Sequence, residues 1–118
     1  ENTDNASILV KMENGSTGVV NYFANGAKSY AKERLEVYSQ EKVLIMDNFV
    51  KTTGYGVKGF SKLKTKLDKG HKTQFSQIVE NIKQGSVELI PYSELINSTK
   101  ASFAAIESLK QGNWINLK

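Results

Sequence analysis

Residues 32–49 read KERLEVYSQEKVLIMDNF, two strand-like segments with a tight turn between them. The first segment, residues 32–39, alternates apolar and polar side chains, which is typical of a strand with two unlike faces. Residues 40–41 predict the turn. The unbroken apolar run at residues 43–46 fits a strand that is buried on both faces. The stretch therefore predicts an antiparallel strand pair near the middle of a sheet.

The alternation gives the first of these strands one apolar and one polar face. Leu35 and Val37 point to one side. The other side carries Arg34, Glu36 and Tyr38. Tyr38, with Tyr22 from an earlier segment, makes this second face less polar than one that meets only water. We therefore expect it to contact a partner.

A second strand pair precedes this stretch. Asn14-Gly15 is the strongest short hairpin signal, and it separates strand-like residues 7–12 from residues 16–24. After the central stretch, residues 60–67 alternate again, and their polar side is rich in lysine. The pattern predicts an amphipathic strand there.

From residue 70 onward the apolar period changes from two to 3.6. The first helix carries a stripe from Phe75 to Ile82, and Gly85 is placed to end it. The second helix is expected to begin around Pro91, with Ser93 as N-cap, and to end at Gly112. Strands followed by helices predict an α+β fold. We expect one domain over residues 1–118, with an open, largely antiparallel sheet of about six strands and two C-terminal helices packed on one face.

The composition excludes several classes of site. The chain has 118 residues, no cysteine and one histidine, so disulfides, cysteine-ligated zinc and a histidine-rich metal site are excluded within one chain. No apolar run approaches the roughly 20 residues that span a bilayer. The first residues are polar and acidic, which does not resemble a signal peptide. We expect a cytoplasmic protein without a membrane segment.

Two motifs allow alternative interpretations. The three glycines of GYGVKG at residues 54–59 have the dinucleotide-binding spacing, but both flanks read as strands, so a cofactor loop is disfavoured. The net charge is +4, and lysines gather at one place. These are Lys58, Lys62, Lys64 and Lys66. They could form a stand-alone basic module for an anionic polymer, or simply a solvated strand edge. Nucleic acid is disfavoured because Phe60 is the only aromatic residue in that stripe.

His71 is the candidate ligand group that the residues themselves suggest. It lies where a strand gives way to a helix, and histidine can both donate and accept hydrogen bonds. The alternative is a histidine that packs or caps at the start of the helix. No pair of carboxylates or nucleophile motif accompanies it. The sequence thus predicts no catalytic, metal-binding or cofactor-binding residue.

Four segments together resemble the C-terminal domain of the Gfo/Idh/MocA oxidoreductases, in the branch of sugar dehydrogenase-like and bi-domain enzymes of bacterial polysaccharide gene clusters. They are NYFANG at 21–26, KERLEVY at 32–38, LIMDNF at 44–49 and KGH at 69–71. The resemblance runs from about residue 7 to residue 117.

The resemblance implies a fragment of a larger enzyme. Family members bind NAD or NADP in an N-terminal Rossmann domain that carries a Glu-Lys-Pro motif, and this chain has neither. The C-terminal domain supplies one wall of the pocket for a sugar or nucleotide sugar, and its open sheet face makes the oligomer contact. The chain alone is then expected to be inactive, with its cofactor in the parent enzyme. The resemblance assigns substrate binding to His71, Lys69 and Tyr55. A domain that serves only structural interactions is the third possibility.

Overall fold

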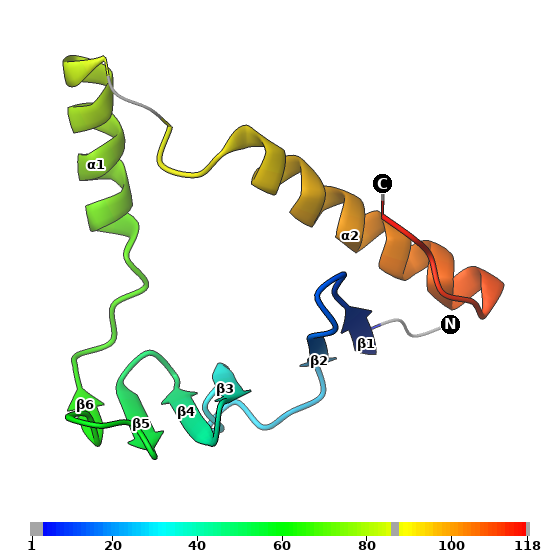
Figure 1. The fold of residues 1–118 in the computed structure, drawn as a ribbon, viewed down its shortest axis with the longest axis horizontal. Coiled ribbons are helices and arrows are strands. Elements are labelled where there is room, and N and C mark those ends of the chain that lie inside the picture. Colours follow the sequence, from blue (N-terminus) through cyan, green and yellow to red (C-terminus); the bar gives the residue numbers. More distant parts are fainter. Residues whose placement is uncertain (1–3, 86–87, 118) are drawn as a thin grey trace. The chain divides into compact units, whose positions relative to one another are not determined.

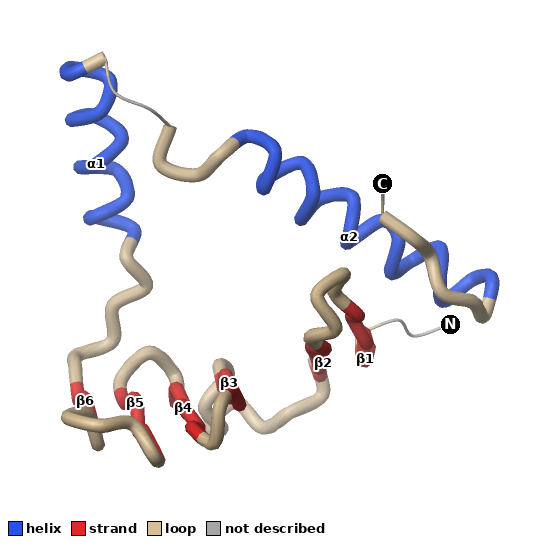
Figure 2. The backbone as a smooth tube through the Cα atoms, in the orientation of Figure 1, coloured by secondary structure: helices blue, strands red, loops and turns tan. Residues whose placement is uncertain are grey.

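The computed structural model describes residues 4–85 and 88–117. Over these residues the chain forms strands first and helices last (Figures 1 and 2). The strands are β1 (Asn5–Lys11), β2 (Thr17–Phe23), β3 (Arg34–Ser39), β4 (Lys42–Asp47), β5 (Lys51–Tyr55) and β6 (Lys62–Lys64). The helices are α1 (His71–Gln84) and α2 (Tyr92–Gln111). None of the described residues is buried.

The first hairpin forms where Asn-Gly predicts it. β1 and β2 pair antiparallel, from Asn5 opposite Phe23 to Lys11 opposite Thr17. The amide of Met12 donates to the carbonyl of Ser16 at 2.8 Å and closes the turn. These two strands form a sheet of their own.

β3, β4, β5 and β6 form a second antiparallel sheet in sequence order. The turn between β3 and β4 consists of Gln40 and Glu41, with φ of 48° and 59°. Positive φ at both central positions is the geometry of a type I′ hairpin turn, whose twist matches that of the strands. The turn expected at residues 40–41 is thus confirmed.

β4 lies in the middle of this sheet, between β3 and β5, as the central stretch predicts. Its residues from Ile45 to Asp47 are half-buried, and Leu44 is 38% exposed. The expectation that β4 is buried on both faces is therefore wrong for the structure described. A strand needs layers above and below to be buried, and its hydrogen-bonded neighbours cover only its edges.

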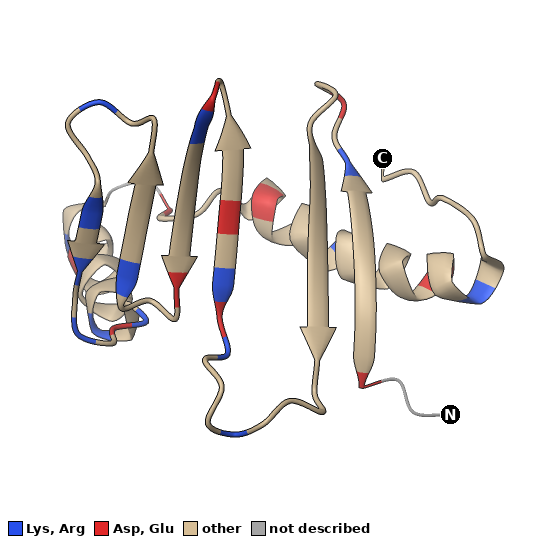
Figure 3. Ribbon diagram, turned by 90° about the horizontal axis from the view of Figure 1, so that it is seen from below, with Lys and Arg blue, Asp and Glu red and all other residues tan. Residues whose placement is uncertain are grey.

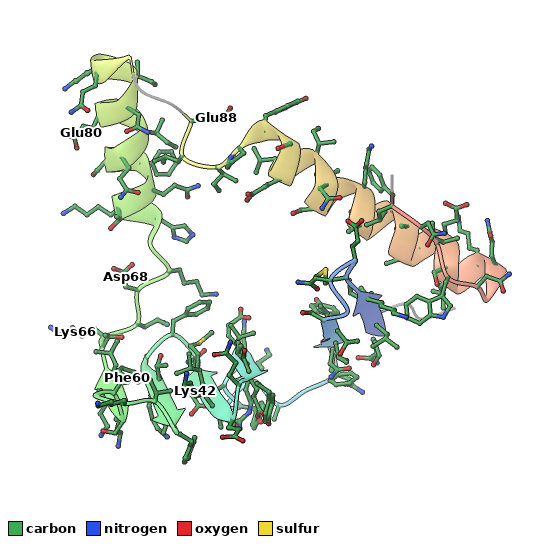
Figure 4. All side chains as sticks on the ribbon, in the orientation of Figure 1. Lys42, Phe60, Lys66, Asp68, Glu80 and Glu88 are labelled. Atoms are coloured by element: carbon green, nitrogen blue, oxygen red, sulfur yellow. The ribbon has the colours of Figure 1, made fainter. Side chains whose placement is uncertain are left out.

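The glycine motif joins two strands. Gly54 lies inside β5, and β6 follows antiparallel rather than as a helix. A dinucleotide-binding loop needs a helix directly after it. The motif is instead flanked by strands on both sides, as the sequence predicted. The lysine-bearing strand is shorter than expected, because β6 ends at Lys64. Lys66 lies on the connection that follows it (Figure 4).

The two helices end as expected but α2 begins differently. α1 ends before Gly85 and α2 before Gly112, and both glycines have positive φ, at 63° and 69°. The N-cap of α2 is Pro91, which has no side-chain cap, so the expectation for Ser93 is wrong. Instead, the carboxylate of Glu88 accepts the Tyr92 amide at 3.2 Å. Proline fits a helix start because it lacks an N–H group to satisfy.

The α+β class, the six antiparallel strands, the open sheets and the two C-terminal helices are confirmed. The strands form two sheets instead of one, because β2 and β3 are linked by residues 24–33 rather than by a tight hairpin. The chain divides into two compact units. One holds β1, β2, most of α1 and all of α2, and the other holds β3 to β6 and the first residues of α1. Packing of the helices on one sheet face stays a prediction.

Candidate functional site

The segment that leads from β6 to α1 is anchored on the turn between β4 and β5. The amide of Thr65 donates to the carbonyl of Val50 at 2.9 Å, and its hydroxyl donates to the carbonyl of Phe49 at 3.1 Å. Asn48 and Phe49 both have positive φ, at 50° and 57°. Because non-glycine residues seldom take this conformation, the turn relies on its neighbours to hold it.

The side chain of Lys69 helps to hold this turn. Its ammonium group lies 3.4 Å from Oε1 of Glu33 and 5.6 Å from the centre of the Phe49 ring. Glu33 also accepts the Asn48 amide through its backbone carbonyl, at 2.7 Å. We call Lys69, Glu33 and Phe49 the junction clasp. No local sequence pattern predicts it, because its members are 36 positions apart at the widest.

His71 follows the junction clasp directly and is the first residue of α1. The residue before it, Gly70, has a φ of 77°, and its amide donates to the carboxylate of Asp68 at 2.7 Å. This local turn starts the helix at His71. The histidine is exposed, and it sits at the strand-to-helix junction where the sequence places it.

Tyr55 occupies a different part of the same unit. It is the last residue of β5, opposite Val43, and is 56% exposed. The junction clasp meets the other end of β5, about 14 Å away at 3.4 Å per strand residue. The structure thus places Lys69 and His71 on one short segment and does not bring Tyr55 to them.

A network of charges covers one face of β3 and β4. Arg34 contacts Glu36 and Asp47, each at 2.7 Å, and the Tyr38 hydroxyl donates to Glu36 at 2.5 Å. Lys51 reaches Asp47 from β5 at 3.5 Å. The network confirms that the polar side chains of β3 share one face. Figure 3 shows basic and acidic positions on β3 and at the two ends of β4.

The network shifts the acid–base properties of its members. The hydrogen bond from Tyr38, followed by that from Arg34, lowers the pKa of Glu36. The same bond to Glu36 raises the pKa of Tyr38. Hydrogen bonding and charge attraction by Glu36 raise the pKa of Arg34. These hydrogen bonds stabilise the ionised carboxylate of Glu36, which lowers its pKa, and the protonated forms of its partners, which raises theirs.

Other kinds of site are not found in the described ranges. Residues 4–85 and 88–117 contain no group of three potential ligands that could hold a metal ion. Over the same residues, neither helix combines the length and the apolar character that crossing a membrane requires. Two hollows in these parts are shallow and are each lined by one segment, residues 75–84 of α1 and residues 12–14.

Comparison of the chain with protein-family models, curated proteins and solved structures finds no match. The site is accordingly interpreted from its own residues: the junction clasp, the adjacent His71, and the charged face of the four-stranded sheet.

Proposed function

We propose that this chain is the substrate-pocket and oligomerisation domain of an NAD(P)-dependent oxidoreductase that acts on a sugar or nucleotide sugar. The observation that supports it most is the junction between β6 and α1. An exposed histidine starts the helix there, directly after a segment fixed to the sheet. The resemblance of KGH at residues 69–71 implies the same position for substrate binding.

The element order gives separate support. An open antiparallel sheet followed by two helices is the architecture that the resemblance implies, and the chain has strands and helices in that order. Fold alone does not define function, because one fold supports many activities. The proposal therefore depends on the chemistry of the junction.

His71 has the chemistry that sugar binding needs. A neutral imidazole offers one donor and one acceptor, which suits a sugar hydroxyl that can do both. The side chain is exposed and so is available to a ligand. In this proposal His71 orients the substrate and carries no catalytic role.

Lys69 can support the same ligand. Its ammonium has three N–H donors, and one points toward Glu33. The remaining donors suit the diphosphate of a nucleotide sugar. Because Glu33 and Phe49 restrain the side chain, less conformational freedom is lost when a ligand binds.

The experiment is a titration of the full chain, followed by NMR of the single histidine ring. UDP-glucose serves as the first nucleotide sugar, and NADH and NADPH serve as cofactor probes. We expect UDP-glucose or a related nucleotide sugar to shift the His71 ring signals. The His71→Ala variant has no histidine ring to observe, so its binding is measured by calorimetry and should be lost. Lys72→Ala, at the next position of α1, is the matched control and should bind normally.

The cofactor probes test the other half of the proposal. Because the Rossmann domain would hold the cofactor, NADH and NADPH should leave the spectrum unchanged. Tight binding of either cofactor, or failure of every nucleotide sugar and free sugar tested, would contradict the proposal.

The alternative function is a stand-alone module for an anionic polymer through residues 58–66. β6 contains only Lys62 and Lys64 of the four lysines in that stripe, so a continuous lysine strand does not form. This observation favours the first proposal.

A further inference from the structure

Two asparagines of the chain are followed directly by glycine, at Asn14-Gly15 and Asn25-Gly26. Glycine has no Cβ atom, so its backbone nitrogen can approach the side chain of the preceding asparagine without steric hindrance. Attack of that nitrogen on the side-chain amide is the route by which asparagine loses ammonia in water. Both pairs are exposed and have the same reacting groups, so a difference between them must come from the local structure.

In the β1–β2 hairpin, hydrogen bonds hold both reacting groups of the first pair. The amide of Gly15 donates to the carbonyl of Met12 at 3.0 Å. Oδ1 of Asn14 accepts the amide of Ser16, also at 3.0 Å. The reaction requires both groups to leave these partners, and a hydrogen bond made by the Gly15 N–H group disfavours loss of its proton. The hairpin turn therefore opposes the reaction at Asn14.

The second pair lies in the connection between β2 and β3 and is not held in this way (Figure 1). Within residues 4–85 and 88–117, Asn25 and Gly26 make no hydrogen bond or ion pair. Apart from the adjacent residues, no atom lies within 4 Å of the place where a Cβ atom of Gly26 would be. The backbone nitrogen of Gly26 and the side chain of Asn25 are therefore free to meet.

We propose that Asn25 is a site of spontaneous deamidation, at which the connection between β2 and β3 gains a carboxylate. The nitrogen of Gly26 loses its proton and bonds to Cγ of Asn25. The bond from Cγ to Nδ2 then breaks, and Nδ2 leaves as ammonia. Water opens the resulting succinimide ring at either of its two C–N bonds, which gives aspartate or isoaspartate. Water is the only co-reactant, and nothing is oxidised or reduced.

The product changes the connection in two ways. Each event replaces a neutral amide by a carboxylate, so the formal charge of +4 falls by one. Isoaspartate also lengthens the backbone between β2 and β3, because the chain then continues through the side-chain carbon. Since β2 ends at Phe23, both changes occur directly beyond the hairpin. The inference is independent of the oxidoreductase proposal, because it uses neither His71 nor Lys69.

The test follows both sites in the full chain during incubation at neutral pH. Tyr22 and Phe23 lie between the two sites, so chymotrypsin places them on separate peptides for mass spectrometry. We expect Asn25 to react roughly tenfold or more faster than Asn14, because the hairpin must give up two hydrogen bonds. The matched control is the same incubation in guanidinium chloride. Without the fold, the two sites should react at similar rates.

Gly26→Ala tests the chemistry without disturbing the fold. The added methyl group hinders attack by the backbone nitrogen and should slow the reaction at Asn25 roughly tenfold, while the rate at Asn14 stays the same. The surroundings are open and the φ of Gly26 is not positive, so alanine fits there.

Three results would overturn the proposal. The first is a reaction at Asn14 as fast as that at Asn25 in the folded chain. The second is a difference between the sites that persists in guanidinium chloride, because it would then come from neighbouring residues rather than from the fold. The third is an Asn25 rate that Gly26→Ala leaves unchanged, or no reaction at Asn25 under conditions in which the unfolded chain reacts.

Discussion

Gly56 is the residue whose backbone leaves the least room for change. Its φ is 68°, and a Cβ atom there would lie 2.7 Å from the carbonyl oxygen of Glu41. Two effects therefore act together. The positive φ is unfavourable for residues with a side chain, and the β3–β4 turn approaches closely. The tight packing of two turns at this point depends on glycine.

Gly56→Ala should destabilise the chain by about 1–3 kcal/mol, because the new methyl group either strains the backbone or displaces the Glu41 carbonyl. Gly26→Ala is the matched control, since nothing lies within 4 Å of its Cβ position. Urea unfolding of both variants gives the comparison. Equal stability of the two would show that the close approach has no energetic effect.

Glu36 is the residue whose charge state matters most in the sheet network. Its folded pKa is lowered, so ionised Glu36 contributes stability at pH above its unfolded pKa. That contribution is lost as the pH falls through the folded pKa. The effect is modest, because Arg34 and Tyr38 are exposed.

Tyr38→Phe removes the hydrogen bond that lowers the Glu36 pKa most. We expect the variant to lose less stability than the natural chain when the pH is lowered from neutral to below the ordinary glutamate value. Urea midpoints over this range measure the difference. Glu41→Gln removes a carboxylate from the turn of the same hairpin and is the control. An unchanged acid dependence in Tyr38→Phe would mean that the bond does not persist in solution.

At the scale of elements, α2 begins without the cap that its sequence suggests. Pro91 occupies the cap position, and Glu88 supplies the acceptor for the Tyr92 amide. The carboxylate also places negative charge near the positive end of the helix dipole. Glu88 thus takes over the role predicted for Ser93.

Glu88→Ala should weaken the start of α2 by about 0.5–1 kcal/mol, the range for losing a cap or a favourable charge at a helix terminus. Hydrogen exchange at the Tyr92 amide should accelerate. Glu88→Gln keeps an acceptor oxygen and should show a smaller change. If Ser93→Ala accelerates exchange at the helix start more than Glu88→Ala does, Ser93 is the true cap.

At the scale of the whole molecule, many large apolar side chains of the described residues are exposed. The apolar face of the four-stranded sheet carries Leu35, Val37 and Leu63, which are 54%, 45% and 51% exposed. Folding free energy comes mainly from removing such surface from water. Further packing must therefore cover these side chains, either within the chain or between copies.

We predict that the chain self-associates through this apolar face of the four-stranded sheet. Light scattering over a range of protein concentrations should show a dimer that is largely insensitive to salt, because apolar contacts are not screened by ions. Leu35→Lys, on the β3 part of the apolar face, should shift the equilibrium toward monomer. A monomer at all concentrations would contradict the oligomer contact.

The candidate site could be predicted from the sequence only in part. His71 was found because a change of period from two to 3.6 marks the junction on which it lies. The engagement of Lys69 with Glu33 and Phe49 was missed, since contacts between distant positions have no local signal. The pairing of Lys51 with Lys64 was missed for the same reason, because the two residues meet only through strand register.

By itself, the sequence determined the strand-then-helix order, the Asn-Gly hairpin, the turn at residues 40–41 and the glycine ends of both helices. Each depends on periodicity or on the backbone preference of a few adjacent residues, so it can be read locally. The tertiary structure alone decided that six strands divide into two sheets, that β6 is short, and that Lys69 braces a turn near β3. These features depend on which strands share hydrogen bonds and in what register, and pairing between distant segments leaves no mark in any one of them.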